Sequence, residues 1–164
     1  MFNNFNLAAL PEDLFYDMVH DCPKTPNIER IVLYTTAINK FEPKTFKGLT
    51  KLEMLSFVDQ RNVSPRFNED SFPPGVFDDL HSLRFFDFFL NDFTTIKKDL
   101  FGPWAKNLIR ITFWVNSITT IEEGAFDNLE SLEMAYFHGN PLDDDAKAEL
   151  YTLYDKENFV QLTI

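Results

Sequence analysis

Apolar residues recur along this chain with one spacing, and the spacing repeats every 24 to 31 residues. Each unit has apolar residues at its first, fourth and sixth positions, and the last two of these alternate with their neighbours as a short strand requires. The five sets are Ile28, Ile31, Leu33; Leu52, Leu55, Phe57; Leu83, Phe86, Phe88; Leu108, Ile111, Phe113; and Leu132, Ala135, Phe137. A unit this small cannot bury its own apolar face, so we expect the units to stack on one another.

A phenylalanine follows later in each unit. These residues are Phe15, Phe46, Phe77, Phe101 and Phe126, separated by 31, 31, 24 and 25 residues. The basic unit therefore has about 24 residues, and two units carry seven more. Phenylalanine accounts for 19 of the 164 residues and glycine for only 5. The pattern predicts a core of large flat side chains at regular positions.

The ninth position of each unit is polar. It holds Thr36, Gln60, Asn91, Asn116 and Asn140. A buried amide at this position can bond the backbone of neighbouring turns where no strand ladder reaches, and asparagine is the residue best suited to do so.

Together these residues resemble the leucine-rich repeat family, in its extracellular class with about 24 residues per unit and the pattern L-x-x-L-x-L-x-x-N-x-I-x-x-I-x-x-x-x-F-x-x-L. The match covers about residues 5–142, and the stretch from Leu108 to Leu129 fits at every anchor, whereas Thr36 and Gln60 replace the asparagine. The resemblance implies an α/β fold: a leucine-rich repeat solenoid with a curved parallel β-sheet on the concave face, irregular convex turns over a phenylalanine spine, and a C-terminal capping helix.

We interpret residues 1–164 as a single domain of this kind. Residues 1–27 form a truncated first repeat and an insertion, 28–141 form four full repeats and the strand of a fifth, and 142–164 form the C-terminal cap. Phe2 falls at a sixth position, so Met1 lies inside a repeat. Two interpretations stay open: the chain is a piece of a longer array, or Met1 to Asn6 forms an improvised cap.

The C-terminal segment predicts a helix over about 143–155 and a strand over 159–164. Asn140-Pro141-Leu142 resembles the start of the family's cap, but Asp144 and Ala146 stand where the family has cysteines. Acidic residues 143–145 suit a helix start, where the helix dipole favours negative charge. The expected apolar side of the helix consists of Leu142, Ala146, Leu150, Leu153 and Tyr154.

Strand alternation assigns positions three, five, seven and eight of each unit to the concave surface, which is where the family binds its partners. The seventh positions would form an apolar strip about 19 Å long, because neighbouring strands lie about 4.8 Å apart. The candidate partner-binding residues are Tyr34, Met54, Val58, Phe85, Phe89, Arg110, Trp114, Met134, Tyr136 and His138. Large connected apolar surfaces and exposed aromatic residues are typical of interfaces.

Several alternatives stay open at this surface. Exposed aromatic residues on a strand also reflect strand propensity and cross-strand packing. Arg30 and Arg110 either pair with carboxylates of a partner or are ordinary solvated charges. The insertion at residues 61–71 is expected to leave the solenoid as a rim loop, which either adds contacts or is a tolerated surface insertion. It contains the sequon Asn62-Val63-Ser64, followed by Pro65.

The charge balance narrows the choice of partner. The 15 Lys and Arg residues against 26 Asp and Glu residues give a net charge of -11, which repels nucleic acid and anionic membrane surfaces.

No apolar run reaches 18 residues, so we expect no membrane insertion. The start of the chain lacks the basic and apolar regions of a secretory signal. Cys22 is the single cysteine and cannot close an internal disulfide.

Catalytic chemistry is not visible in the sequence. The three histidines, His20, His81 and His138, occupy unrelated repeat positions and form no convergent triad. Cys22 and His20 supply two of the four ligands that a structural zinc site needs. Neither phosphate-binding glycine motif occurs. We therefore expect a protein that is not an enzyme and has no cofactor or metal.

The leading hypothesis is a non-enzymatic protein-binding module that uses its aromatic concave face. One alternative is a structural subunit of a homo- or hetero-oligomeric assembly, which includes self-association through the same strip. The other is a carrier of a small hydrophobic or sugar ligand. Resemblance to secreted, receptor-like members of the family implies an extracellular location.

Overall fold

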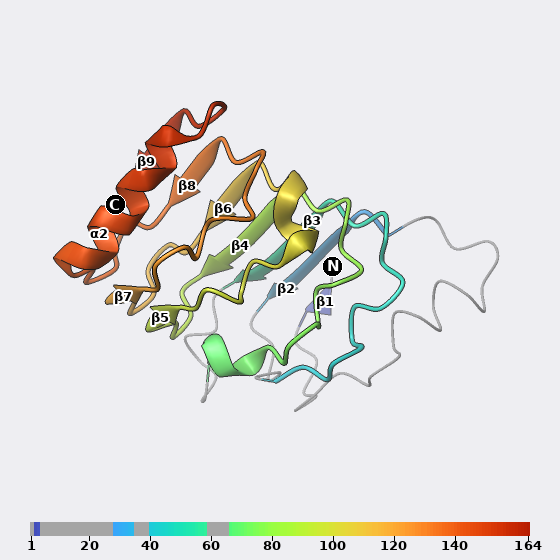
Figure 1. The fold of residues 1–164 in the computed structure, drawn as a ribbon. Coiled ribbons are helices and arrows are strands. Elements are labelled where there is room, and N and C mark those ends of the chain that lie inside the picture. The colour runs from blue at the N-terminus through green and yellow to red at the C-terminus, as the bar shows by residue number, and fades with distance from the viewer. Residues whose placement is uncertain (1, 4–27, 35–39, 59–65) are drawn as a thin grey trace.

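The computed structural model describes residues 2–3, 28–34, 40–58 and 66–164. Within these residues the protein is an α/β molecule with a parallel sheet and a C-terminal helix, α2 (Asp144–Tyr151) (Figure 1). The sheet has seven strands, which lie side by side in chain order. They are β1 (Phe2–Asn3), β2 (Arg30–Tyr34), β3 (Met54–Val58), β4 (Phe85–Phe89), β6 (Arg110–Thr112), β8 (Met134–Tyr136) and β9 (Gln161–Thr163).

The strands pair with equivalent repeat positions opposite each other. The third position gives one continuous row, in which Arg30, Met54, Phe85, Arg110 and Met134 are successive partners. The expected stacking in register is therefore confirmed for these strands, and the arrangement is compatible with a solenoid. At the N-terminal edge Phe2 pairs with Leu33, as its assignment to a sixth position predicts.

A second layer covers the core on the side away from this sheet. It contains the short strands β5 (Thr95–Ile96) and β7 (Thr120–Ile121), which pair in parallel, and two 3-10 helices, η1 (Glu69–Ser71) and η2 (Pro103–Asn107). Figure 1 shows these elements following one another along the outside of successive coils. The apolar positions of the units face inward between the two layers.

Phenylalanine fills this core in two columns. The sixth positions form the first column, with successive ring centroids 4.7, 5.1 and 5.4 Å apart in Phe57, Phe88, Phe113 and Phe137. The expected spine forms the second column and is buried at Phe46, Phe77, Phe101 and Phe126, whereas Phe15 lies outside the described residues. Trp104 packs between two spine rings, 5.2 Å from Phe77 and 6.3 Å from Phe101.

The ninth-position asparagines act as predicted. The side-chain amides of Asn91, Asn116 and Asn140 donate to the carbonyl of the sixth residue in the preceding unit, at 3.1, 3.1 and 2.7 Å. The Asn116 and Asn140 side-chain oxygens also accept backbone N–H groups of the preceding coil. The amides therefore bond adjacent coils where the strands end. Thr36 and Gln60 lie outside the described residues.

The second insertion differs from the expected rim loop in the part that the structure describes. Phe67 is fully buried and stacks on Phe41 with ring centroids 5.3 Å apart. The Phe67 carbonyl also accepts the backbone N–H of Asp92 at 2.9 Å. The insertion returns to the core because it carries a phenylalanine of its own. Burial of this side chain is more favourable in free energy than leaving it exposed to water. Asn62 lies outside the described residues, as does Cys22.

The C-terminal cap is close to its prediction. Asp143 is the N-cap of α2, and its carboxylate accepts the Ala146 N–H at 2.7 Å. After α2 the chain tightens into a 3-10 helix, η3 (Thr152–Asp155), which changes the direction of later side chains. Tyr154 is consequently 56% exposed, contrary to its predicted place on the apolar side, and packs against Phe159. The described residues contain no helix long and apolar enough to cross a membrane.

Candidate functional site

The candidate surface is the face of the seven-stranded sheet that points away from the core, here called the open face. Strand alternation and the common register place the third, fifth and seventh positions there in three rows. All ten candidate residues lie on this face or at its edge, as the sequence predicts. They are Tyr34, Met54, Val58, Phe85, Phe89, Arg110, Trp114, Met134, Tyr136 and His138.

The seventh-position row is a largely aromatic strip that is exposed at Tyr34, Trp114 and His138. Tyr34 is 44% exposed and Trp114 is 47% exposed, whereas Phe89 is half-buried. The Trp114 ring contacts both neighbours edge to face, with centroids 6.1 Å from Phe89 and 6.2 Å from His138. These contacts hold the rings in place, because aromatic pairs favour this geometry.

The fifth-position row is buried at its three central residues, contrary to the expectation that it is presented at the surface, and half-buried at Val32 and Tyr136. Ser56, Asp87 and Thr112 are all buried. Their strand positions place them on the open face, and the Arg110 side chain from the third-position row lies against Asp87. Alternation therefore predicts the correct side of the sheet and not the depth of a side chain on that side.

A buried ion pair lies at the centre of this row. Asp87 is 0% exposed, and Arg110 on the next strand binds it with two nitrogens, at 2.9 and 3.3 Å. The Arg110 guanidinium also lies 4.9 Å from the Phe85 ring centroid. Arg110 is thus neither a solvated charge nor a free group, since Asp87 neutralises it and fixes its plane. Arg30, the first residue of the third-position row, is exposed.

Two apolar hollows flank Trp114. The first, of about 530 Å³, extends toward β8 and β9, and the second, of about 440 Å³, extends toward β3. Phe89 and Trp114 line both hollows, so the indole stands as a wall between them. The first hollow is also lined by Arg110, Thr112, Tyr136, His138 and Thr163, and the second by Val58, Leu90 and Val115.

Backbone strain marks the second hollow. Leu90 and Val115 have φ angles of 60° and 54°, in the left-handed region that side chains with a Cβ rarely adopt. Both are eighth positions, and the next unit has Gly139 there with a φ of 77°. Sequence reasoning missed this conformation, although the glycine at the equivalent position was a usable sign. Strained residues of this kind cluster at binding surfaces, where the surrounding structure holds them.

Other side chains order the far end of the face. The Tyr136 hydroxyl donates to the Gln161 side-chain oxygen at 3.0 Å and lies 3.5 Å from the Met134 sulfur. Among the described residues no group of three or more His, Cys, Asp and Glu side chains is placed to hold a metal ion.

Comparison with known proteins shows likeness in fold only. The chain matches no protein-family model and no curated protein. A chain of the octameric complex of Latrophilin 3, Unc5D and FLRT2 (LRR) is 24% identical, with a TM-score of 0.59, and the match covers 73% of this chain and 34% of that one. A chain of the Toll–Spätzle complex, a molecular hub in Drosophila development and innate immunity, is 15% identical, with a TM-score of 0.43 and coverage of 98% and 31%.

The present chain thus spans about a third of the length of each of these chains. The first likeness favours a leucine-rich-repeat-like fold and agrees with the repeat seen in the sequence. Both solved structures are complexes of proteins.

Proposed function

We propose that this chain is a leucine-rich repeat solenoid that works as a non-enzymatic recognition module and binds another protein on its open face. The observation that carries the proposal is the pair of apolar hollows around the exposed Trp114 ring, one of them walled by two strained residues. Strand propensity explains an aromatic residue on a sheet, but it does not explain apolar side chains held at positive φ.

The binding energy of such a surface would concentrate in its central aromatic residues. Trp114 and Phe89 line both hollows, and truncation of an anchor of this type costs about 2 kcal/mol or more of binding free energy. Arg110, already neutralised by Asp87, would offer its remaining N–H groups to neutral acceptors such as peptide carbonyls.

The test is affinity enrichment with immobilised wild-type protein and with the Trp114→Asp, Phe89→Asp double variant. The matched control is Tyr151→Asp, Tyr154→Asp, which places the same two charges on exposed aromatic residues of the cap. A protein partner retained by the wild type and the control, and lost by the first variant, supports the proposal. Equal retention by all three folded proteins contradicts it.

A second candidate function is supported by the size of the first hollow. Its volume of about 530 Å³ lies within the range of small-molecule sites, roughly 300–1,000 Å³. A small hydrophobic or sugar ligand carried there would appear as added mass in native mass spectrometry and would be lost in Trp114→Asp. Self-association through the strip would instead double the mass measured by light scattering.

We also propose an extracellular location, which the resemblance of the repeat to the secreted class supports.

A further inference from the structure

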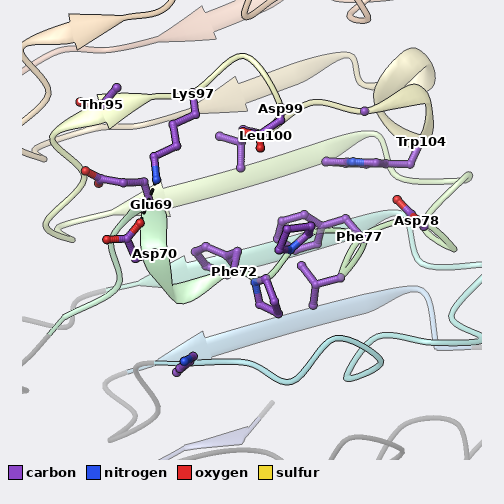
Figure 2. A pocket seen from close by; sticks show the side chains of 16 residues that line it. Glu69, Asp70, Phe72, Phe77, Asp78, Thr95, Lys97, Asp99, Leu100 and Trp104 are labelled. Atoms are coloured by element: carbon purple, nitrogen blue, oxygen red, sulfur yellow. Dashed lines mark hydrogen bonds and ion pairs between the residues drawn. The ribbon is translucent and has the colours of Figure 1, made fainter.

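A slot of about 350 Å³ lies in the outer layer, on the opposite side of the core from the open face (Figure 2). One wall is the coil segment at residues 69–78, and the other is the next segment, at residues 95–104. The first segment belongs to the unit with seven extra residues, and the unit after it has the basic length. The unequal lengths explain why the two segments do not close on each other here.

The floor of the slot is aromatic and contains one unused donor. Phe77 and Trp104 pack together with ring centroids 5.2 Å apart, and the half-buried Phe72 and Leu100 extend the floor. Trp104 is only 4% exposed. Its indole N–H donates no hydrogen bond to any residue that the structure describes. The indole nitrogen is not among the fully buried polar atoms that lack a partner in the described residues, so it is open to water and can donate to an acceptor on a bound molecule.

An ion pair and two hydrogen bonds join the two segments at one end of the slot. Lys97 donates to Asp70 at 2.8 Å across the two segments, and Glu69 accepts both the N–H and the hydroxyl of Thr94. The hydrogen bond from Lys97 to Asp70 raises the pKa of the lysine, and Asp70, Glu69 and Asp99 add to the effect by Coulomb attraction. The side chains at this end are therefore held by hydrogen bonds across the two segments.

Negative charge without an ion pair lies farther along the slot. Asp78 and Asp99 line the slot, are exposed, and form no ion pair with the described residues, although Asp99 lies close enough to Lys97 to help raise the pKa of the lysine. Figure 2 shows Glu69 and Asp70 at one end and Asp78 with Trp104 at the other. Carboxylates beside the slot attract cations by Coulomb attraction, and its apolar floor suits the methylene stem of a lysine or arginine side chain.

We propose that this outer slot binds a peptide segment of a partner protein through a lysine or arginine side chain. The cationic head group contacts Asp78 and Asp99, and its methylene stem lies on Trp104 and Leu100. A carbonyl of the same peptide accepts the Trp104 indole N–H. The net charge of -11 draws basic segments toward the molecule and repels anionic ligands. The slot is independent of the open face.

The test uses acetyl-Ala-Arg-Ala-amide as the probe and acetyl-Ala-norleucine-Ala-amide as its uncharged match. The protein has two tryptophans, and substitution of each by phenylalanine assigns the two indole N–H resonances in ¹⁵N-labelled protein. The arginine peptide is expected to shift the Trp104 resonance saturably, with a dissociation constant on the order of 1 mM or tighter, and to leave the Trp114 resonance unmoved. The norleucine peptide is expected to bind at least about tenfold more weakly.

The double variant Asp78→Asn, Asp99→Asn should bind the arginine peptide about tenfold or more weakly, since both carboxylates are lost. The control Glu123→Gln, Glu130→Gln removes two exposed charges elsewhere and should change affinity less than about twofold. If the first variant does not fold, Asp99→Asn alone is used, because that side chain makes no hydrogen bond to the described residues.

An unmoved Trp104 resonance, equal effects of the two peptides, or equal losses of affinity in the two variants overturns the proposal. None of these outcomes bears on the open face, which Trp114 reports.

Discussion

At the scale of single residues, we expect a substitution at the strained Val115 to affect stability and partner binding differently. A β-branched residue at a φ of 54° costs roughly 1–2 kcal/mol, which glycine avoids. We expect Val115→Gly to leave the free energy of unfolding unchanged or raise it by up to about 1 kcal/mol. The same variant removes a wall of the second hollow and should weaken a partner on the open face.

The matched change is Val160→Gly, which removes the same side chain at a well-exposed site outside the left-handed region. It should lower stability by about 0.5–1 kcal/mol. Urea unfolding of both variants supplies the measurement. A loss of more than about 1 kcal/mol in Val115→Gly would mean that the side chain contributes more by packing than its backbone costs.

The ion pair of Asp87 and Arg110 gives a second residue-scale prediction. Arg110→Met leaves a fully buried carboxylate without its only ion-pair partner among the described residues, and should cost about 3 kcal/mol or more of stability. Adding Asp87→Asn should recover most of the loss, because the uncompensated charge disappears. A double-mutant cycle by urea unfolding measures the coupling, and additive losses in the two single variants would contradict it.

At the scale of elements, the cap depends on its first hydrogen bond. Asp143→Ala removes the acceptor of the Ala146 N–H and should lower the free energy of unfolding by about 1 kcal/mol. Asp155→Ala removes an equal charge at the end of η3 and should change stability by less than about 0.5 kcal/mol. Thermal unfolding followed by circular dichroism compares the two, and equal shifts would show that the cap geometry is unimportant.

Sequence reasoning predicted the elements well where a period constrains them. The strands, their common register and the asparagine bonds follow from positions one, four, six and nine, which recur in each unit. Phe67 was wrongly assigned to a rim loop because a single aromatic among turn-forming residues has no period to place it. Tyr154 was misplaced because the helix pattern assumes 3.6 residues per turn, and η3 does not keep that period.

The sequence predicted which face of the sheet carries the candidate residues. It did not predict how deeply each side chain is buried or where the hollows lie. Alternation placed Trp114 and Phe89 on the correct face, since that depends only on a period of two. The burial of Asp87, the hollows beside Trp114 and the left-handed turns at Leu90 and Val115 depend on neighbours from other coils. The outer slot depends on the length difference between two units, and the effect of that difference on packing depends on contacts between coils.

At the scale of the whole molecule, the charge excess should make stability depend on salt. The 26 acidic and 15 basic residues leave a net charge of -11 on a small domain, and like charges on a compact surface repel. Salt reduces this repulsion, because the Debye length falls from about 30 Å at 0.01 M to about 8 Å at 0.15 M. The described ion pairs act in the opposite direction; they are Arg66 with Asp92, Lys97 with Asp70, Arg110 with Asp87, and Lys147 with Asp144.

Repulsion should be the larger effect, since three of those pairs are partly or mostly exposed and each contributes roughly 0–1 kcal/mol. We therefore expect the melting temperature to rise between 0.01 and 0.15 M sodium chloride at neutral pH. Glu123→Gln, Glu130→Gln should melt higher at low salt and gain less from added salt, because it starts with less repulsion. A melting temperature that falls with salt would mean that attraction between neighbouring coils, rather than the net charge, controls the electrostatic part of stability.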